Sequence, residues 1–71
     1  MRVQCLNNYE GVKVKNLFGV ICHIHDDISL VGVEFYEPFI GGHTCDGACT
    51  MPYTGLYMYR LFWDEGNFEI L

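Results

Sequence analysis

The fold is decided by the stretch Gly19-Val20-Ile21-Cys22-His23-Ile24-His25-Asp26-Asp27-Ile28-Ser29-Leu30-Val31-Gly32-Val33-Glu34-Phe35-Tyr36. Apolar residues recur at every second position on both sides of a short acidic segment that is typical of a turn. Two such runs joined by a turn predict a β-hairpin. In its first arm, strict alternation would place Val20, Cys22 and Ile24 on one face and both histidines on the other.

The period of two continues towards both ends of the chain. It predicts further strands over Val3–Cys5, Val12–Lys15, Gly55–Tyr59 and Asn67–Leu71. Between the last two, Leu61–Gly66 suits a single 3₁₀ turn, and no long window carries the 3.6-residue period of a helix. The sequence therefore predicts a single all-β domain over residues 1–71, with four to six short strands. A closed barrel is favoured because closure removes exposed sheet edges.

Composition limits the classes of protein to which the chain can belong. Its 71 residues are 51% hydrophobic, which is too apolar for intrinsic disorder. No apolar run reaches the roughly 18 residues of a membrane span, and no secretory signal pattern is present. We therefore expect a cytoplasmic protein with no membrane association.

The charge is acidic and unevenly distributed. The formal net charge is −5, which argues against direct nucleic-acid binding through phosphates. Residues 1–25 carry three basic residues against one acid, a net of +2, whereas residues 26–71 carry one against eight, a net of −7. Such a field would steer the protein towards a partner with a basic surface. Solubility alone also explains an acidic surface.

A glycine-rich segment, Gly41–Cys49, brings two thiols and an imidazole within seven positions. His43, Cys45 and Cys49 are candidate zinc ligands, because zinc sites often use thiolates two to four residues apart. Two alternatives remain open: a Cys45–Cys49 disulfide, which reducing cytosol disfavours, or cysteines that pack as small hydrophobes while His43 hydrogen-bonds the loop. A fourth zinc ligand would come from one of four residues: His23, His25, Cys5 or Asp46.

The other two cysteines, Cys5 and Cys22, alternate with the inward apolar residues, and we expect both to fill the core. No residue pattern indicates an enzyme. Cys45 and His43 supply a thiol and a base, but side chains two apart in a tight loop are poorly placed for those roles and no orienting group is evident. The adjacent acids Asp64 and Glu65 would face opposite sides of a strand.

Aromatic residues exceed what a core of this size needs, and exposed aromatics beside acids are typical of protein interfaces. An aromatic groove of this kind can also take a proline-rich segment, and the acids would suit one that carries arginine or lysine. The candidate partner-binding residues are Tyr36, Phe39, Tyr57, Tyr59, Trp63, Asp64 and Glu65.

Three stretches resemble the opening of a KOW-type or SH3-like barrel: Gly11-Val12-Lys13-Val14, Phe18-Gly19-Val20-Ile21 and Val31-Gly32-Val33-Glu34-Phe35. The later His43-x-Cys45-x-Gly47-x-Cys49 element, followed by an aromatic strand and a final short strand, is similar to small SH3-like proteins encoded by bacteriophages and their hosts. KOW modules that bind nucleic acid tend to be basic, and this chain is acidic. The resemblance implies an SH3-like barrel and a viral context, with no mechanism attached.

The leading functional hypothesis is a small non-enzymatic protein-binding module encoded by a phage. It would dock through an acidic, aromatic surface on a host protein of defence or nucleic-acid processing and inhibit it, in the host cytoplasm. One alternative is a zinc-stabilised structural or assembly module. Another is a homo-oligomer that sequesters a small ligand between subunits.

Overall fold

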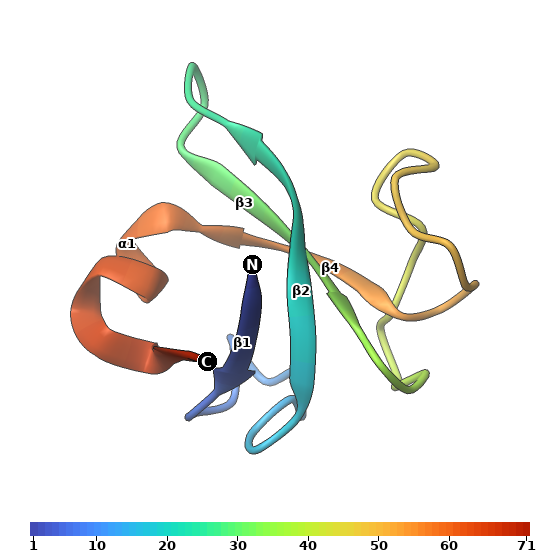
Figure 1. Ribbon diagram of the computed structural model, residues 1–71, viewed down its shortest axis with the longest axis horizontal. Helices are drawn as coiled ribbons and strands as arrows, with labels where there is room; N and C mark the ends of the chain where they lie inside the picture. The colour runs from blue at the N-terminus through green and yellow to red at the C-terminus, as the bar shows by residue number, and fades with distance from the viewer.

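The computed structural model describes all residues from 1 to 71 and contains five antiparallel strands in one curved sheet (Figure 1). The strands are β1 (Arg2–Cys5), β2 (Phe18–His25), β3 (Leu30–Phe35), β4 (Gly55–Tyr59) and β5 (Phe68–Ile70), in the order β4-β3-β2-β1-β5. A helical turn lies between β4 and β5. This confirms the predicted all-β, SH3-like arrangement with a turn before the last strand, which is α- and π-helical where the sequence predicted a 3₁₀ turn.

The core lies on the concave side of the sheet, where strands from both halves of the chain contribute alternate side chains. Phe35 and Met58 are the largest fully buried side chains, and Cys5 is also fully buried, as the sequence predicts. The strand residues of this core are Val3, Cys5, Val31, Val33, Phe35, Leu56, Met58 and Phe68.

The predicted strand over Val12–Lys15 is wrong. The N–H of Tyr9 donates to the oxygen of Val12 at 3.1 Å, and the N–H of Val12 donates back at 2.7 Å, which closes a tight turn. Gly11 makes this turn possible with φ of 82°. Val14 is fully buried beyond it. Val14 therefore belongs to the core and Val12 packs against it from a turn, without forming a sheet strand.

A β-bulge interrupts β2. Ile21 pairs with Val33 and His23 pairs with Gly32, so Cys22 is an additional residue with no partner in β3. Ile21 packs against the core, whereas Cys22 does not. The prediction that Val20, Cys22 and Ile24 share the inward face, and that Cys22 fills the core, is therefore wrong. The bulge shifts the alternation by one position within the strand.

The helical turn consists of α1 (Arg60–Phe62) and a π-helical segment, η1 (Trp63–Asn67). The side-chain amide of Asn67 donates to the oxygen of Phe62 at 2.7 Å. The ring of Phe62 packs edge-on against Tyr9, with centroids 4.9 Å apart, so the turn that links the two edge strands, β4 and β5, lies beside the first loop. None of the helical segments is long and apolar enough to cross a membrane.

Candidate metal centre

The segment 36–54 is a long loop that folds back against β3 and β4. Figure 1 shows it standing on the opposite side of the sheet from the helical turn. His43 and Gly55 exchange backbone hydrogen bonds of 2.9 and 2.7 Å, which attach the loop to the edge of β4. The carboxylate of Glu34, on β3, accepts hydrogen bonds from the Thr50 N–H at 3.1 Å and the Thr50 hydroxyl at 2.6 Å.

The Glu34–Thr50 contact gives a pH-dependent prediction. The Thr50 hydroxyl holds the pKa of the Glu34 carboxyl below its ordinary value. A lowered folded-state pKa contributes stability above the unfolded pKa of about 4.3, and this stability is lost as the pH falls through the folded-state pKa. We expect Thr50→Val to lower the free energy of unfolding by about 1 kcal/mol at pH 7.

Urea unfolding at pH 7 and pH 3, in chelator and reductant, measures this effect. Thr44→Val is the matched control, because the hydroxyl of this exposed loop threonine makes no hydrogen bond. The difference between wild type and Thr50→Val should shrink at the lower pH as the Glu34 carboxylate takes up protons, and measurements at still lower pH follow the loss through the lowered folded-state pKa. A difference that stays equal over the whole pH series would mean that the carboxylate is not the important acceptor.

Three thiols meet where the loop returns to the sheet. The sulfur atoms of Cys22, Cys45 and Cys49 all lie within 4.8 Å of one another, and all four cysteines of the chain are free thiols. Zinc bonds to thiolates at about 2.3 Å, so sulfurs on one tetrahedral zinc stand about 3.8 Å apart. The cluster therefore needs a contraction of no more than about 1 Å to hold a metal ion of this size.

Gly55 forms the floor of the three-thiol cluster. A Cβ at this position would lie 2.5 Å from the sulfur of Cys49 and 2.7 Å from that of Cys45. Both distances are shorter than any ordinary contact, so a side chain here would displace the thiols. Because Gly55 has no side chain, the loop cysteines can approach the sheet backbone and reach Cys22.

The backbone of the loop directs Cys45 and Cys49 towards the same point. Cys45, Asp46 and Gly47 all have positive φ, of 48°, 56° and 88°. The N–H of Cys49 donates to the oxygen of Thr44 at 3.0 Å, which closes the turn. This compact turn is the local reason that two thiols four residues apart in sequence meet.

The electrostatics of the cluster disfavour negative charge unless a cation is present. Burial, reinforced by repulsion from the Cys49 and Cys22 thiolates, raises the pKa of the Cys45 thiol far above its ordinary value. Burial, followed by the nearby Cys49, also raises the pKa of Cys22. A bound metal ion reverses this effect, because it is the largest local charge and displaces the thiol protons.

The Nδ1 atom of His43, which lies beside the cluster, is already a hydrogen-bond acceptor. This atom accepts a hydrogen bond from the backbone N–H of Cys45 at 2.9 Å. A neutral imidazole that accepts at Nδ1 carries its proton on Nε2, so in this arrangement neither nitrogen has a free lone pair for a metal ion held by the thiols. Of the three residues expected as zinc ligands, the structure brings Cys45 and Cys49 together, and Cys22 completes the group.

The residues expected as a fourth ligand lie in different places. Cys5 is in the core, and the carboxylate of Asp46 accepts a hydrogen bond from the Tyr57 hydroxyl at 2.8 Å. That bond, followed by burial, raises the pKa of Tyr57 to about 12. The rings of His23 and His25 pack with centroids 4.0 Å apart and planes tilted by 49°, and His25 also lies 5.4 Å from the Tyr57 ring.

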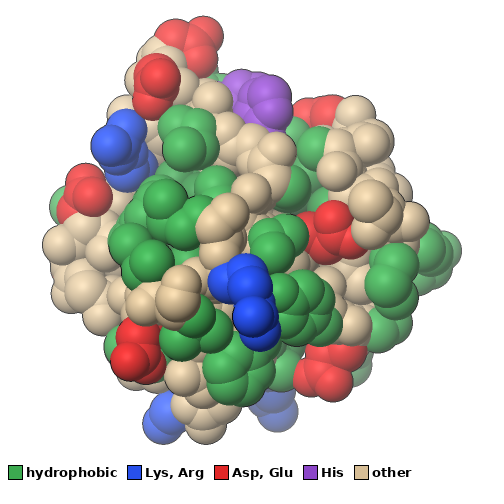
Figure 2. Space-filling view, in the orientation of Figure 1, with side chains coloured by type: hydrophobic (Ala, Val, Ile, Leu, Met, Phe, Trp, Pro, Cys, Tyr) green, Lys and Arg blue, Asp and Glu red, His purple; other side chains and the backbone are tan.

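The residues expected to bind a partner have different environments. Tyr36 and Tyr59 are 51% and 58% exposed, and Asp64 and Glu65 are also exposed. Phe39 and Trp63 pack against the core, and Tyr57 is half-buried near the loop. On the face in Figure 2, acidic side chains are scattered around the periphery, and a basic side chain lies near the centre among hydrophobic ones.

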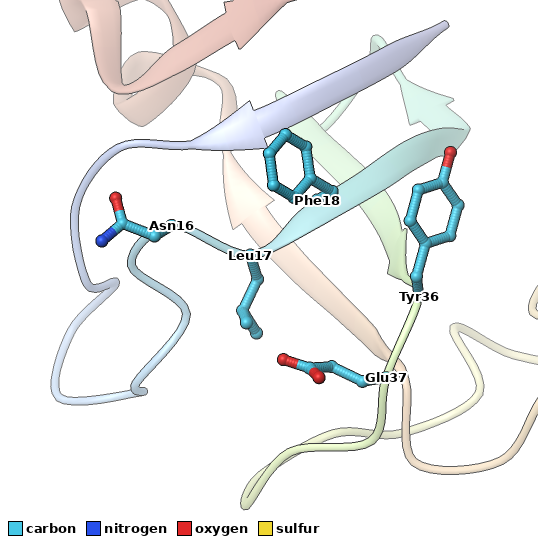
Figure 3. Close-up of a pocket in the computed structure, with 5 residues that line it drawn as sticks. All are labelled: Asn16, Leu17, Phe18, Tyr36 and Glu37. Atoms are coloured by element: carbon cyan, nitrogen blue, oxygen red, sulfur yellow. The ribbon is translucent and has the colours of Figure 1, made fainter.

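A small pocket of about 180 Å³ lies away from the cluster, beside the start of β2 and the end of β3. Figure 3 shows the rings of Phe18 and Tyr36 on one side of it, and the Glu37 carboxylate on another side, pointing towards the Leu17 side chain. Its volume is below the few hundred Å³ of a typical small-molecule site, but it is large enough for part of a peptide side chain. A second hollow of about 330 Å³ is lined by Gly11, Lys13 and Ile40.

No match to the chain was found among family models, curated proteins or solved structures. The resemblance to phage SH3-like proteins therefore stays a prediction.

Proposed function

We propose that the protein is a small non-enzymatic binding module whose long loop is fixed to the sheet by a zinc ion. The observation that carries this proposal is the convergence of the Cys22, Cys45 and Cys49 sulfurs within 4.8 Å from two distant segments. Thiolates select soft or borderline ions, and zinc is the most common ion in structural sites that several cysteines form.

A bound ion would add stability to a loop that buries few side chains. Between residues 36 and 53 only Cys45 is buried, so the loop has almost no core of its own. Small domains commonly compensate for a limited core with a metal or a disulfide. Because a structural zinc site does not exist in the unfolded chain, its binding free energy adds to the folding free energy.

Native mass spectrometry of the reduced protein tests the proposal directly. We expect the mass to rise by one zinc per chain after incubation with one equivalent of zinc. Cys5→Ala is the matched control and should take up the same zinc, since Cys5 is buried in the core and its thiol donates to the oxygen of Asn7 at 3.1 Å. A chain that stays metal-free with excess zinc would reject the zinc module.

We also propose that the exposed aromatic side chains dock a protein partner with a basic surface. Support comes from the Phe18–Tyr36 pocket, because both rings are about half exposed and Glu37 lines the same pocket. Tyrosine is a frequent hot-spot residue, and carboxylates attract arginine and lysine. In a phage context, such docking would inhibit a host protein by occupying a cleft that normally binds nucleic acid.

A proline-rich peptide that contains arginine is the first probe for this surface. Tyr36→Ala is expected to weaken its binding by about 2 kcal/mol without changing the melting temperature. The control Tyr53→Ala removes another exposed tyrosine, 67% exposed and outside the pocket, and should leave binding intact. NMR shift changes on titration, at low and high salt, locate the contact. Shift changes confined to residues other than Phe18, Tyr36 and Glu37 would refute the assignment of this pocket.

A further inference from the structure

The bulge in β2 places two neighbouring residues on the same outward face. Because Cys22 has no partner and His23 pairs with Gly32, both residues stand opposite one position of β3. A Cβ at Gly32 would lie 3.3 Å from the Cβ of His23. The imidazole of His23 therefore projects from the same side of the sheet as the Cys22 thiol.

A structural zinc site is almost always four-coordinate, so the three-thiol cluster requires one more ligand. Three other candidate donors outside β2 take part in hydrogen bonds. His43 Nδ1 accepts the Cys45 N–H, Asp46 accepts the Tyr57 hydroxyl through one carboxylate oxygen, and Glu34 accepts both donors of Thr50 through one carboxylate oxygen. The imidazoles of His23 and His25, on the same strand as Cys22, make no side-chain hydrogen bond and are borderline donors of the kind that zinc prefers.

His23 is better placed than His25 in two respects. It follows Cys22 directly, whereas His25 lies further along β2, opposite Leu30. Its Cβ also stands over Gly32, and the loop sulfurs stand over Gly55. These two glycines are diagonal neighbours, because Gly32 pairs with Tyr57 and Gly55 with Glu34. Diagonal positions in an antiparallel pair are about 7–8 Å apart, a gap that cysteine and histidine side chains close from opposite ends.

We propose that His23 is the fourth zinc ligand and that the site is a Cys₃His centre. The inference rests on the proposed zinc module. His23 is exposed, so rotation about its side-chain bonds moves the ring from His25 towards the thiols without moving the backbone. A neutral ring nitrogen then donates its lone pair to the zinc ion, and the three thiols release their protons to solvent as they bind.

The Co²⁺- and Zn²⁺-loaded forms of the full chain test this ligand. His23→Ala should weaken zinc binding by more than about 100-fold, beyond the 10–100-fold typical of residues that only support a ligand. His25→Ala is the matched control, since it removes the other ring of the His23–His25 pair, and its affinity should stay near that of wild type. His23→Cys should restore tight binding, with the Co²⁺ spectrum of a four-thiolate site.

The outcomes separate the two proposals. In ¹⁵N NMR of the zinc form, one ring nitrogen of His23 should show a metal-bound shift, while His25 remains an ordinary imidazole. If wild type binds zinc and His23→Ala binds it equally well, His23 is not a ligand, although the three-thiol site stands. If wild type binds neither Zn²⁺ nor Co²⁺, the zinc module itself is rejected.

Discussion

Replacing Cys45 by serine is expected to abolish the zinc-dependent stabilisation of this protein. Cys45 is 1% exposed and its sulfur lies within 4.8 Å of both other thiols, so its loss removes the best-buried ligand. At free zinc about 1,000 times the dissociation constant, wild type should gain about 4 kcal/mol. For a domain of this size that gain raises the melting temperature by roughly 15–30 °C, and Cys45→Ser should show no such rise.

Thermal unfolding of wild type and Cys45→Ser, each with zinc and with chelator, measures the effect. The comparison within each variant matters, because serine also changes the stability of the metal-free protein. Cys5→Ala should lose stability but keep the full increase on adding zinc. If Cys45→Ser gained as much stability from zinc as wild type, the metal would be bound somewhere else in the molecule.

Gly55→Ala is expected to destabilise the protein by about 3 kcal/mol, the upper end for overpacking, and to disrupt the three-thiol cluster. The new methyl group would lie 2.5 Å from the Cys49 sulfur and 2.7 Å from both the Cys45 sulfur and the backbone oxygen of His43. The backbone oxygen cannot rotate away. The loop must therefore move off β4, which separates its two cysteines from Cys22.

Chemical denaturation and zinc titration of Gly55→Ala report the two consequences independently. Gly47→Ala is the contrasting variant, because a Cβ there meets nothing within 4 Å and only the positive φ of 88° is strained. Gly47→Ala should lower the free energy of unfolding by about 1 kcal/mol and preserve zinc binding. Retention of both stability and zinc affinity by Gly55→Ala would show that the loop sits further from the sheet than the structure places it.

The fold could be predicted well from sequence because most strands here keep a simple alternation. Val31, Val33 and Phe35 face the core as their spacing indicates, and Leu56 and Met58 do the same on β4. The turn before β5 was also predictable, since no alternation runs through Leu61–Gly66. The strand predicted over Val12–Lys15 does not form, and the reason is local. Glu10 and Gly11 adopt positive φ, and the resulting turn uses backbone groups that a strand would pair with a neighbour.

The candidate site could be predicted only in part. The spacing of Cys45 and Cys49 indicated a shared purpose, and their sulfurs do meet. Cys22 could not be assigned, because apolar residues occupy both faces of the strand and alternation cannot reveal a bulge between Ile21 and His23. The sequence left two roles open for His43, a metal ligand or a hydrogen-bonding loop residue. The structure shows its Nδ1 in a hydrogen bond to the loop backbone.

The β2 bulge has an evolutionary consequence. Without Cys22, Ile21 would be followed directly by His23, and the strand would run without interruption, with Ile21 opposite Val33, His23 opposite Gly32 and Ile24 opposite Val31. A single codon thus separates an ordinary regular hairpin from one that presents a thiol to the loop. A barrel of this kind can gain or lose the third thiol of the cluster by one insertion or deletion, with the pairing of the other hairpin residues retained.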